Sequence, residues 1–580
     1  MPGEARSYQF GDFTLDAGDC QLVRNGQTVN LRPKVFETLL FLVQRRGRLV
    51  TREDLLVGVW ADTDVGEEVL THCITEVRKA LDDDPRRPRY VRTVPRRGYR
   101  FIAEVGAIRT APSQCGSPPD EPAVPPTTIA VLPFANLGGD PENEYLCDGL
   151  AEEIIDGLTK LPGLRVVAHS SSFAFKGRDA DVREIGRQLG VGSLLEGSVR
   201  RSGNRVRIAA QLINTADGYH LWSEQYDRRA GDLFEIEDDI SAAILDKLKL
   251  KLLAGWHPAR RPTDSVEAYH LYLKGRAHWH RRFRGQLENA IECFEKAVAL
   301  DPRFAPAHAG LADCYGTLGV WGFAPPTAVF PKAQESARRA LEIDATLAEA
   351  HAALAFVDTF YAWNWEAAER GFARATELKP GSALTRLWNG HLLSILGRFD
   401  EAFAEMRIAQ DLDPLSPVVR PNLGWTYTLA HQYDRALAEL NAVLAFDPNN
   451  GLAHFYLGYA FVGAGKLRDG VRSLERAREL TGGMPWLAQS IGWIQGLGGD
   501  QRSARAALAA ARPTGEGYVP SSAIAMLHLG LDDDAAALDW LERALAERDA
   551  LMVWVPYMSA FDRLHGQPRF AALLRGLGLA

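Results

Sequence analysis

The pattern of hydrophobic and polar positions changes twice along the chain. Residues 1–105 combine short alternating segments with helical stripes, residues 129–252 mix apolar runs with period-two alternation, and residues 265–580 are helical throughout. Residues 106–128 form a Pro/Ser-rich stretch that is too polar to pack, and HPARRPTD at 257–264 interrupts two helical patterns. We therefore expect a multidomain protein with three domains, the first two joined by an extended linker at 106–128.

The last of these regions is built from repeats. A small residue, followed by apolar or small residues four and seven positions later, recurs at intervals of 43, 35, 34, 34, 34, 34 and 33 residues. The repeats start at Ala290, Ala333, Ala368, Ala402, Ala436, Gly470, Ala504 and Ala537. Antiparallel helices approach closely only where side chains are small, and stacked units bury the larger ones. Spacing and residue types resemble the tetratricopeptide repeat, which implies an all-α superhelix at 265–580 whose concave face binds a protein or peptide.

The middle region, residues 129–252, predicts a mixed α/β domain. IAVLPF is an apolar strand, helices are expected near 144–161 and 181–189, and period-two alternation on both sides of Ser202-Gly203-Asn204 predicts a β-hairpin. Ser170–Ser172 is expected in a loop. The AVLPF strand and the HLWSEQYDR ending resemble the amino-terminal domain of TolB as it occurs in bacterial regulators, which implies a fold and little about activity.

The first region predicts strands over residues 8–31, three helices and a final hairpin. The second helix opens with Thr51-Arg-Glu-Asp54, which is typical of a capping box. The third helix, near residues 67–81, carries an apolar stripe at Leu70, Ile74, Val77 and Leu81. The opposite face, or its flank, presents the residues that we expect to meet DNA: His72, Thr75, Glu76, Arg78 and Lys79.

An arginine cluster follows that helix. Seven arginines occur within residues 86–100, and guanidinium groups suit phosphate oxygens. Pro95-Arg-Arg-Gly98 predicts the turn of a hairpin, because its glycine permits a positive φ. The tip would therefore present Arg96 and Arg97.

These segments together resemble the OmpR/ToxR-type winged helix-turn-helix, an α+β fold. The resemblance rests on LRPKVFETLLFLV, REDLLVGVW, VLTHCITEVRKAL and YVRTVPRRGYRF, and it covers nearly all of residues 8–105. It implies that the third helix enters the major groove while the hairpin, called the wing, touches the minor groove or backbone. By this resemblance His72 and Thr75 are base-edge candidates, Arg78 and Lys79 contact backbone or groove, and Arg97 with Tyr99 are wing contacts.

Several of these residues have a second interpretation. Glu76 either accepts a hydrogen bond from cytosine N4 or pairs with Lys79 one turn along. The arginine cluster either binds phosphates or pairs with Asp82–Asp84, and we favour phosphates. Thr75-Glu76 stands where phosphorylated response regulators often have two basic residues, so the chain is closer to the ToxR-like branch.

Composition agrees with a folded regulator. The net charge is −8, but residues 1–105 hold 17 Lys and Arg against 16 Asp and Glu, so the acidic excess lies elsewhere. Six scattered cysteines form no C-x-x-C pair, and no signal peptide or 18-residue apolar run occurs, which favours a cytoplasmic protein without a membrane span. No receiver domain precedes the winged helix, so we expect one-component control.

We find no catalytic constellation and expect neither an enzyme, a cofactor nor a metal. His278 and His280 lie two apart on a predicted helix and point away from each other. The glycine-rich segment 136–140 lacks the Lys-Ser/Thr of a phosphate loop.

The sequence therefore predicts a transcriptional regulator that binds double-stranded DNA in a sequence-specific way and senses a protein or ligand through its repeats. RNA polymerase is a further candidate partner, and a dimer is the candidate state on DNA. The alternative is a repeat scaffold whose winged helix docks protein rather than DNA.

Overall fold

The chain forms two compact units, Met1–Glu121 and Pro122–Ala580, and each is described by itself. The computed structural model describes residues 7–16, 21–24, 27–29, 31, 33–59, 67–84, 87–94, 97–103, 105–108, 128–139, 144–159, 164–178, 180–202, 205–229, 239–240, 263–280, 284–482, 486–511 and 518–579.

The first unit opens with an antiparallel sheet in the order β4-β3-β2-β1-β8. Its strands are β1 (Ser7–Phe10), β2 (Phe13–Asp16), β3 (Gln21–Arg24), β4 (Gln27–Val29) and β8 (Gly106–Ile108). Strand β8 lies in the stretch that we assigned to the linker, and its Ala107 pairs with Tyr8 of β1. The linker therefore begins later than predicted, because residues 106–108 cover the open edge of β1.

Three helices and a second sheet complete this unit. The helices are α1 (Pro33–Gln44), α2 (Arg52–Val59) and α3 (Glu67–Leu81), and the sheet, in the order β5-β7-β6, consists of β5 (Val50–Thr51), β6 (Val91–Val94) and β7 (Gly98–Phe101). The predicted capping box is confirmed: Thr51 N donates to Asp54 Oδ2 over 2.9 Å, and Asp54 N donates to Thr51 Oγ1 over 3.0 Å. Strands β6 and β7 are the predicted wing.

Aromatic rings join the two sheets of this unit. Phe10 packs edge-on against Tyr90 and Phe101, with ring centroids 5.8 and 5.0 Å apart, and Phe13 meets Tyr90 at 5.6 Å. Such pairs contribute beyond the area they bury. The base of the wing is thereby fixed to the amino-terminal sheet.

A buried carboxylate also anchors the wing. Asp83, directly after α3, accepts hydrogen bonds from the backbone N–H groups of Arg89 and Tyr90 through Oδ1, at 2.6 and 3.2 Å, and from Val91 through Oδ2 at 2.8 Å. These three residues lead into β6. Asp83 therefore ties the end of the third helix to the start of the wing.

The second unit begins with a mixed sheet, as the expected α/β class requires. Its order is β11-β9-β12-β13-β14, with β10 also paired to β12. The strands are β9 (Thr128–Val131), β10 (Ala135–Asn136), β11 (Arg165–Val166), β12 (Ser193–Ser202), β13 (Arg205–Asn214) and β14 (His220–Arg229), and the helices are α4 (Glu144–Thr159), α5 (His169–Phe173) and α6 (Val182–Leu189). The predicted hairpin is confirmed, since Ser202 pairs with Arg205. The resemblance to TolB stays a prediction.

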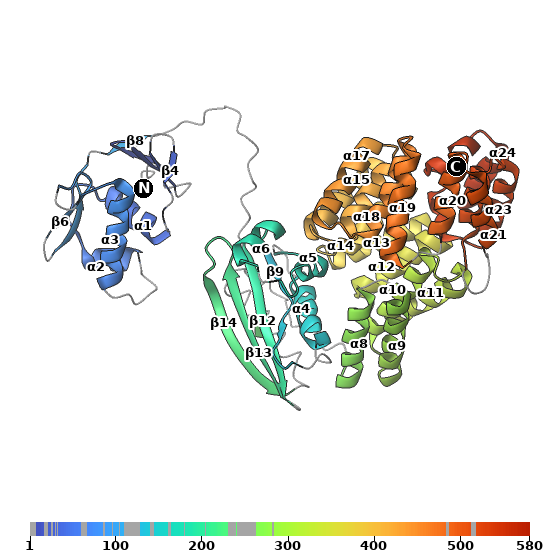
Figure 1. Ribbon diagram of the computed structural model, residues 1–580. Helices are drawn as coiled ribbons and strands as arrows, with labels where there is room; N and C mark the ends of the chain where they lie inside the picture. The colour runs from blue at the N-terminus through green and yellow to red at the C-terminus, as the bar shows by residue number, and fades with distance from the viewer. Residues whose placement is uncertain are drawn as a thin grey trace. The chain divides into compact units, whose positions relative to one another are not determined.

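Paired helices make up the rest of the second unit (Figure 1). They are α8 (Val266–Trp279), α9 (Arg284–Leu300), α10 (Ala305–Val320), α11 (Pro326–Ile343), α12 (Ala348–Val357), α13 (Trp365–Leu378), α14 (Ala383–Ile395), α15 (Phe399–Leu412), α16 (Val419–Leu429), α17 (Tyr433–Phe446), α18 (Gly451–Gly463), α19 (Leu467–Thr481), α20 (Leu487–Leu497), α21 (Gln501–Ala510), α22 (Ser521–Gly530), α23 (Asp534–Ala546) and α24 (Pro568–Leu577). Short turns η3 (Asp358–Ala362), η4 (Ala550–Trp554) and η5 (Ser559–Leu564) interrupt them. The repeat starts identified from the sequence are all buried, and the +4 and +7 positions are buried except Leu508 and Ala511.

Glycines allow the two helices of a repeat to touch. A Cβ atom placed on Gly424 of α16 would lie 2.5 Å from Leu440 Cγ of α17, and one on Gly458 of α18 would lie 2.6 Å from Leu474 Cγ of α19. Gly390 stands 34 residues before Gly424 and faces Met406 in the same way. These glycines are a second register of the repeat, which the pattern of small residues did not use.

Buried polar contacts hold the mixed sheet domain to the repeats. Asp413, at the end of α15, accepts hydrogen bonds from the backbone N–H and the hydroxyl of Ser171, at 2.9 and 2.5 Å. Lys379, at the end of α13, reaches Asp156 of α4 at 2.8 Å and Glu349 at 2.7 Å. The expectation of a loop at Ser170–Ser172 is wrong, because these residues form α5 and dock on Asp413.

The carboxyl-terminal helices fold back onto earlier repeats. Trp365 Nε1 donates to the carbonyl of Leu577 over 3.0 Å, and His431 Nε2 donates to the carbonyl of Tyr557 over 3.1 Å. The superhelix is therefore closed by its own end. None of the helices in the described ranges has the length and hydropathy that a bilayer crossing requires.

The close approach of α16 and α17 predicts a coupled pair of substitutions. We expect Gly424→Ala to destabilise the protein by roughly 1–3 kcal/mol, because the new methyl group overlaps Leu440. The same change in a Leu440→Ala background should cost less, since the overlapping atoms are gone. Urea unfolding followed by circular dichroism measures both. Gly285→Ala on α9, which meets no atom within 4 Å, is the matched control, and additive effects of Gly424→Ala and Leu440→Ala would contradict this account.

The anchor of the wing predicts a second effect. Asp83→Asn places an amide N–H2 against a backbone N–H, so we expect a loss of roughly 1–3 kcal/mol in the stability of the first unit. Asp82→Asn changes a neighbouring exposed carboxylate and should be nearly neutral. Thermal unfolding compares the two variants, and equal melting temperatures would refute the role of Asp83.

Candidate nucleic-acid interface

The third helix carries one face of the candidate interface. The four residues of the predicted stripe are buried: Leu70, Ile74, Val77 and Leu81. Thr75 and Lys79 are exposed and Glu76 is half-buried. His72 belongs to α3, but its side chain lies outside the described residues. The stripe therefore turns Thr75 and Lys79 away from the core, where a groove could receive them.

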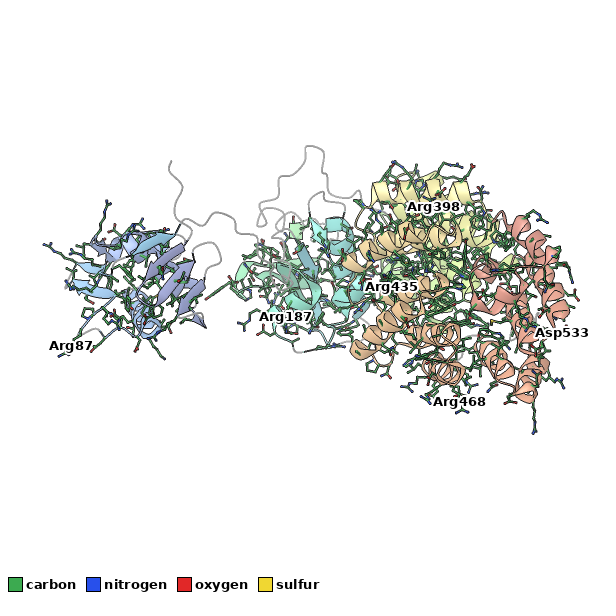
Figure 2. The ribbon with its side chains drawn as sticks, turned by 90° about the horizontal axis from the view of Figure 1, so that it is seen from above. Arg87, Arg187, Arg398, Arg435, Arg468 and Asp533 are labelled. Carbon is green, nitrogen blue, oxygen red and sulfur yellow. The ribbon has the colours of Figure 1, made fainter. Side chains whose placement is uncertain are left out.

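The wing and the segment before it carry most of the positive charge. Four arginines there are exposed: Arg87, Arg89, Arg92 and Arg97. Arg87 projects away from the first unit in Figure 2. Arg96, expected at the tip, lies outside the described residues. Lys79 and the four arginines give this part of the unit the cations that phosphate contacts need.

The aspartates that could neutralise the arginine cluster have other contacts. Asp83 is bound to the backbone of residues 89–91, and Asp82 lies 3.8 Å from Arg24 of β3. Arg89 stands over the ring of Tyr90, 5.5 Å from its centroid. These contacts favour the phosphate interpretation of the cluster.

Two residues of the expected interface lie differently from our expectation. Arg78 Nη2 donates to the carbonyl of Val91 at 3.0 Å and to Thr93 Oγ1 at 2.7 Å, so its guanidinium joins α3 to β6. Tyr99 is 6% exposed and pairs with Val50 and Thr93 in the sheet. Arg78 therefore positions the wing and Tyr99 packs its base, while exposed Arg92 on β6 takes the outward place.

Elsewhere, residues far apart in the sequence form a buried charged cluster. Glu152 Oε1 of α4 accepts from Arg276 Nε and from His280 Nε2, each at 2.9 Å, and the His280 ring stacks on His169 of α5 at 3.9 Å. Burial raises the pKa of Glu152, but Arg276 and His280 outweigh it and hold that pKa well below its usual value. Burial also lowers the pKa of His169 well below its usual value, so its ring is neutral.

This cluster has the spacing of a metal site but carries competing charge. Ligand atoms of Glu152, His169 and His280 lie within 4.8 Å of one another. Arg276 already holds the carboxylate, so a cation there would sit beside a guanidinium group. His278, the other histidine considered, instead contacts Gln286 at 2.7 Å. We assign the cluster to joining α4, α5 and α8; sequence spacing gave no sign of it.

Comparisons with known proteins agree with the geometry of the first unit. The family described as transcriptional regulatory protein, C terminal, matches residues 26–101, and a TPR repeat family matches residues 282–319. Transcriptional regulator HilA of Salmonella typhimurium is 27% identical over 425 residues, 71% of this chain and 72% of that protein. The solved DNA-binding domain of Escherichia coli CadC is 32% identical, covering 18% of this chain and all of that one, with a TM-score of 0.17.

A relative of another kind also matches. Putative adenylate cyclase 3 of Rhizobium meliloti is 40% identical over 242 residues, and the match covers 41% of each chain. The shared part is thus less than half of either protein. Through residues 26–101 this chain belongs to the OmpR/PhoB-type winged-helix transcriptional regulators, and it combines that DNA-binding domain with tetratricopeptide repeats.

Proposed function

We propose that the chain is a one-component regulator that contacts DNA through one face of α3 and through the wing. The observation that carries this proposal is the set of exposed cations beside a fixed recognition helix: Lys79, Arg87, Arg89, Arg92 and Arg97. Thr75 and Glu76 stand on the same helix where base edges would be met. Arg78 and Asp83 hold helix and wing together, so both can reach one DNA site.

The repeats, in this proposal, receive the signal, which is a protein or a ligand. They share one compact unit with the mixed sheet domain, and buried ion pairs join the two parts. A change in the repeats would therefore be felt in the sheet domain. Binding as a dimer to two half-sites and contact with RNA polymerase belong to the same proposal.

We further propose that the chain acts without catalysis, in the cytoplasm. Two of the relatives compared here carry names of regulators or DNA-binding domains, and bacterial DNA is reached from the cytoplasm. The name of the putative adenylate cyclase describes that protein, and the shared 41% of its length leaves most of it outside the match.

Salt dependence of DNA binding tests the interface. With the full chain and a labelled random-sequence duplex, we expect Arg92→Ala and Arg97→Ala each to reduce the slope of log K against log salt by about 0.9, because each removes one phosphate contact. Arg468→Ala, an exposed arginine of α19 in the other unit (Figure 2), should leave the slope unchanged. Salt-independent binding, or equal slopes for all variants, would refute the proposed interface.

Charge reversal separates a regulator from a scaffold. The variant Arg96→Glu/Arg97→Glu should lose occupancy of chromosomal sites in genome-wide mapping, because the wing tip would repel phosphates. Its melting temperature should match that of the unmodified chain. Unchanged occupancy together with loss of a co-purifying protein would favour the scaffold instead.

A further inference from the structure

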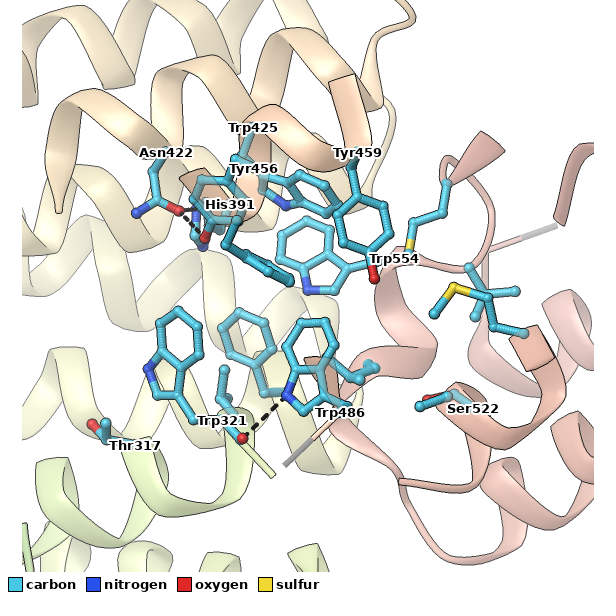
Figure 3. Close-up of a pocket in the computed structure, with 18 of the residues that line it drawn as sticks. Thr317, Trp321, His391, Asn422, Trp425, Tyr456, Tyr459, Trp486, Ser522 and Trp554 are labelled. Atoms are coloured by element: carbon cyan, nitrogen blue, oxygen red, sulfur yellow. Dashed lines mark hydrogen bonds between the residues drawn. The ribbon is translucent and has the colours of Figure 1, made fainter. Parts of the chain in front are cut away.

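The concave side of the repeats encloses a chamber lined by aromatic rings (Figure 3). It holds about 920 Å³ of space free of protein atoms, part of it open to solvent. Its walls include Trp321, Trp388, Trp425, Tyr456, Trp486 and Trp554. We call this space the aromatic chamber. Its volume is in the range of small-molecule sites, and flat rings on several sides suit a flat ligand.

The carboxyl-terminal turns close the chamber. Trp554 of η4 packs edge-on against Trp425 of α16 at 6.2 Å and against His391 of α14 at 5.2 Å. Trp486 Nε1 donates to the carbonyl of Trp321, 165 positions earlier, over 3.2 Å. An extended peptide needs an open groove and partners for its backbone along its length. The closed, ring-lined space favours a compact ligand.

The chamber walls carry no formal charge. All the residues that line the chamber are described, and none is Asp, Glu, Lys or Arg. His391 is the one histidine among them, and burial lowers its pKa to about 4, so it is neutral at pH 7. A charged ligand would lose its hydration without gaining a counter-charge.

Two buried polar atoms of the lining have no hydrogen-bond partner among the described residues. His391, 5% exposed, shares its Nε2 with Asn422 Oδ1 at 3.0 Å, and Asn422 Nδ2 donates to the carbonyl of Val418, which fixes the amide orientation. Nε2 therefore carries the proton, and His391 Nδ1 is an acceptor that nothing satisfies. Ser522 Oγ, on the 3% exposed Ser522 of α22, is the second such atom. A buried polar atom without a partner costs free energy that a ligand could recover.

We propose that the aromatic chamber binds one uncharged, planar small molecule that donates a hydrogen bond to His391 Nδ1. The rings of the chamber would stack on its faces, and Ser522 would meet a second polar group. This inference rests on the proposed function only in making such a molecule the signal; binding itself is independent of DNA.

A matched pair of fluorescent probes tests the chemistry. N-phenyl-1-naphthylamine is uncharged and has one N–H donor, and 8-anilino-1-naphthalenesulfonate is the same skeleton with an anionic group. With the full chain and no DNA, we expect saturable binding of one N-phenyl-1-naphthylamine per chain, and binding of the sulfonate weaker by about tenfold or more. Absence of saturable binding overturns the proposal. Equal affinity for both probes also overturns it, since that would indicate an open, solvated groove of the kind that accepts peptides.

Variants locate the bound probe. Ala523→Trp fills the chamber and should abolish binding, while His391→Phe keeps a ring of similar size and should weaken binding by roughly 2–10-fold through loss of the acceptor. Tyr219→Ser, which removes an exposed ring far along the chain from the repeats, is the control and should leave affinity unchanged. Circular dichroism checks folding, and if Ala523→Trp fails to fold, His391→Phe decides. Unchanged binding in the folded chamber variants refutes the site. Because no DNA is present, that failure would leave the DNA-binding proposal intact, and failure of DNA binding would leave the probe result intact.

Discussion

In the repeats, a helix can approach its partner only where one of the two surfaces has almost no side chain. Gly390, Gly424 and Gly458 provide that surface at 34-residue intervals, and Met406, Leu440 and Leu474 fill it. Because the same contact recurs in each unit, the helix pairs stack with a constant geometry. The curvature that results brings the carboxyl-terminal turns back against the early repeats, and the aromatic chamber is a consequence of that closure.

Polar contacts have a different task in the second unit. Glu152, Lys379 and Asp413 are buried, and each binds a residue from the other part of the unit. Breaking such a pair would leave a charge buried alone, which costs several kcal/mol, roughly 3–5 by the usual experience. The mixed sheet domain and the repeats are therefore linked by contacts that tolerate only one arrangement, which suits transmission of a signal.

The first unit solves a separate problem, that of holding a recognition helix and a wing in a fixed relation. Asp83 binds the backbone that enters β6, and Arg78 binds β6 from α3. Neither residue needs to touch DNA for this purpose. The exposed cations around them can then act as one surface, because the scaffold beneath is rigid.

The sequence by itself determined the elements and their class. The stripe at Leu70, Ile74, Val77 and Leu81 fixed the buried side of α3, and the small-residue period fixed the repeats, because both signals are local and repeat with the geometry of a helix. Arg97 and Lys79 were found in the same way and are exposed.

Only the tertiary structure decided which polar side chains meet. It placed Tyr99 in the core, gave Arg78 to the wing, brought β8 beside β1, and assembled Glu152, His169 and His280 from three distant segments. The chamber belongs to the same group, although Trp425 and Tyr459 recur 34 residues apart on equivalent helices. Contacts between segments depend on how helices and strands pack, and no short window of sequence carries that information.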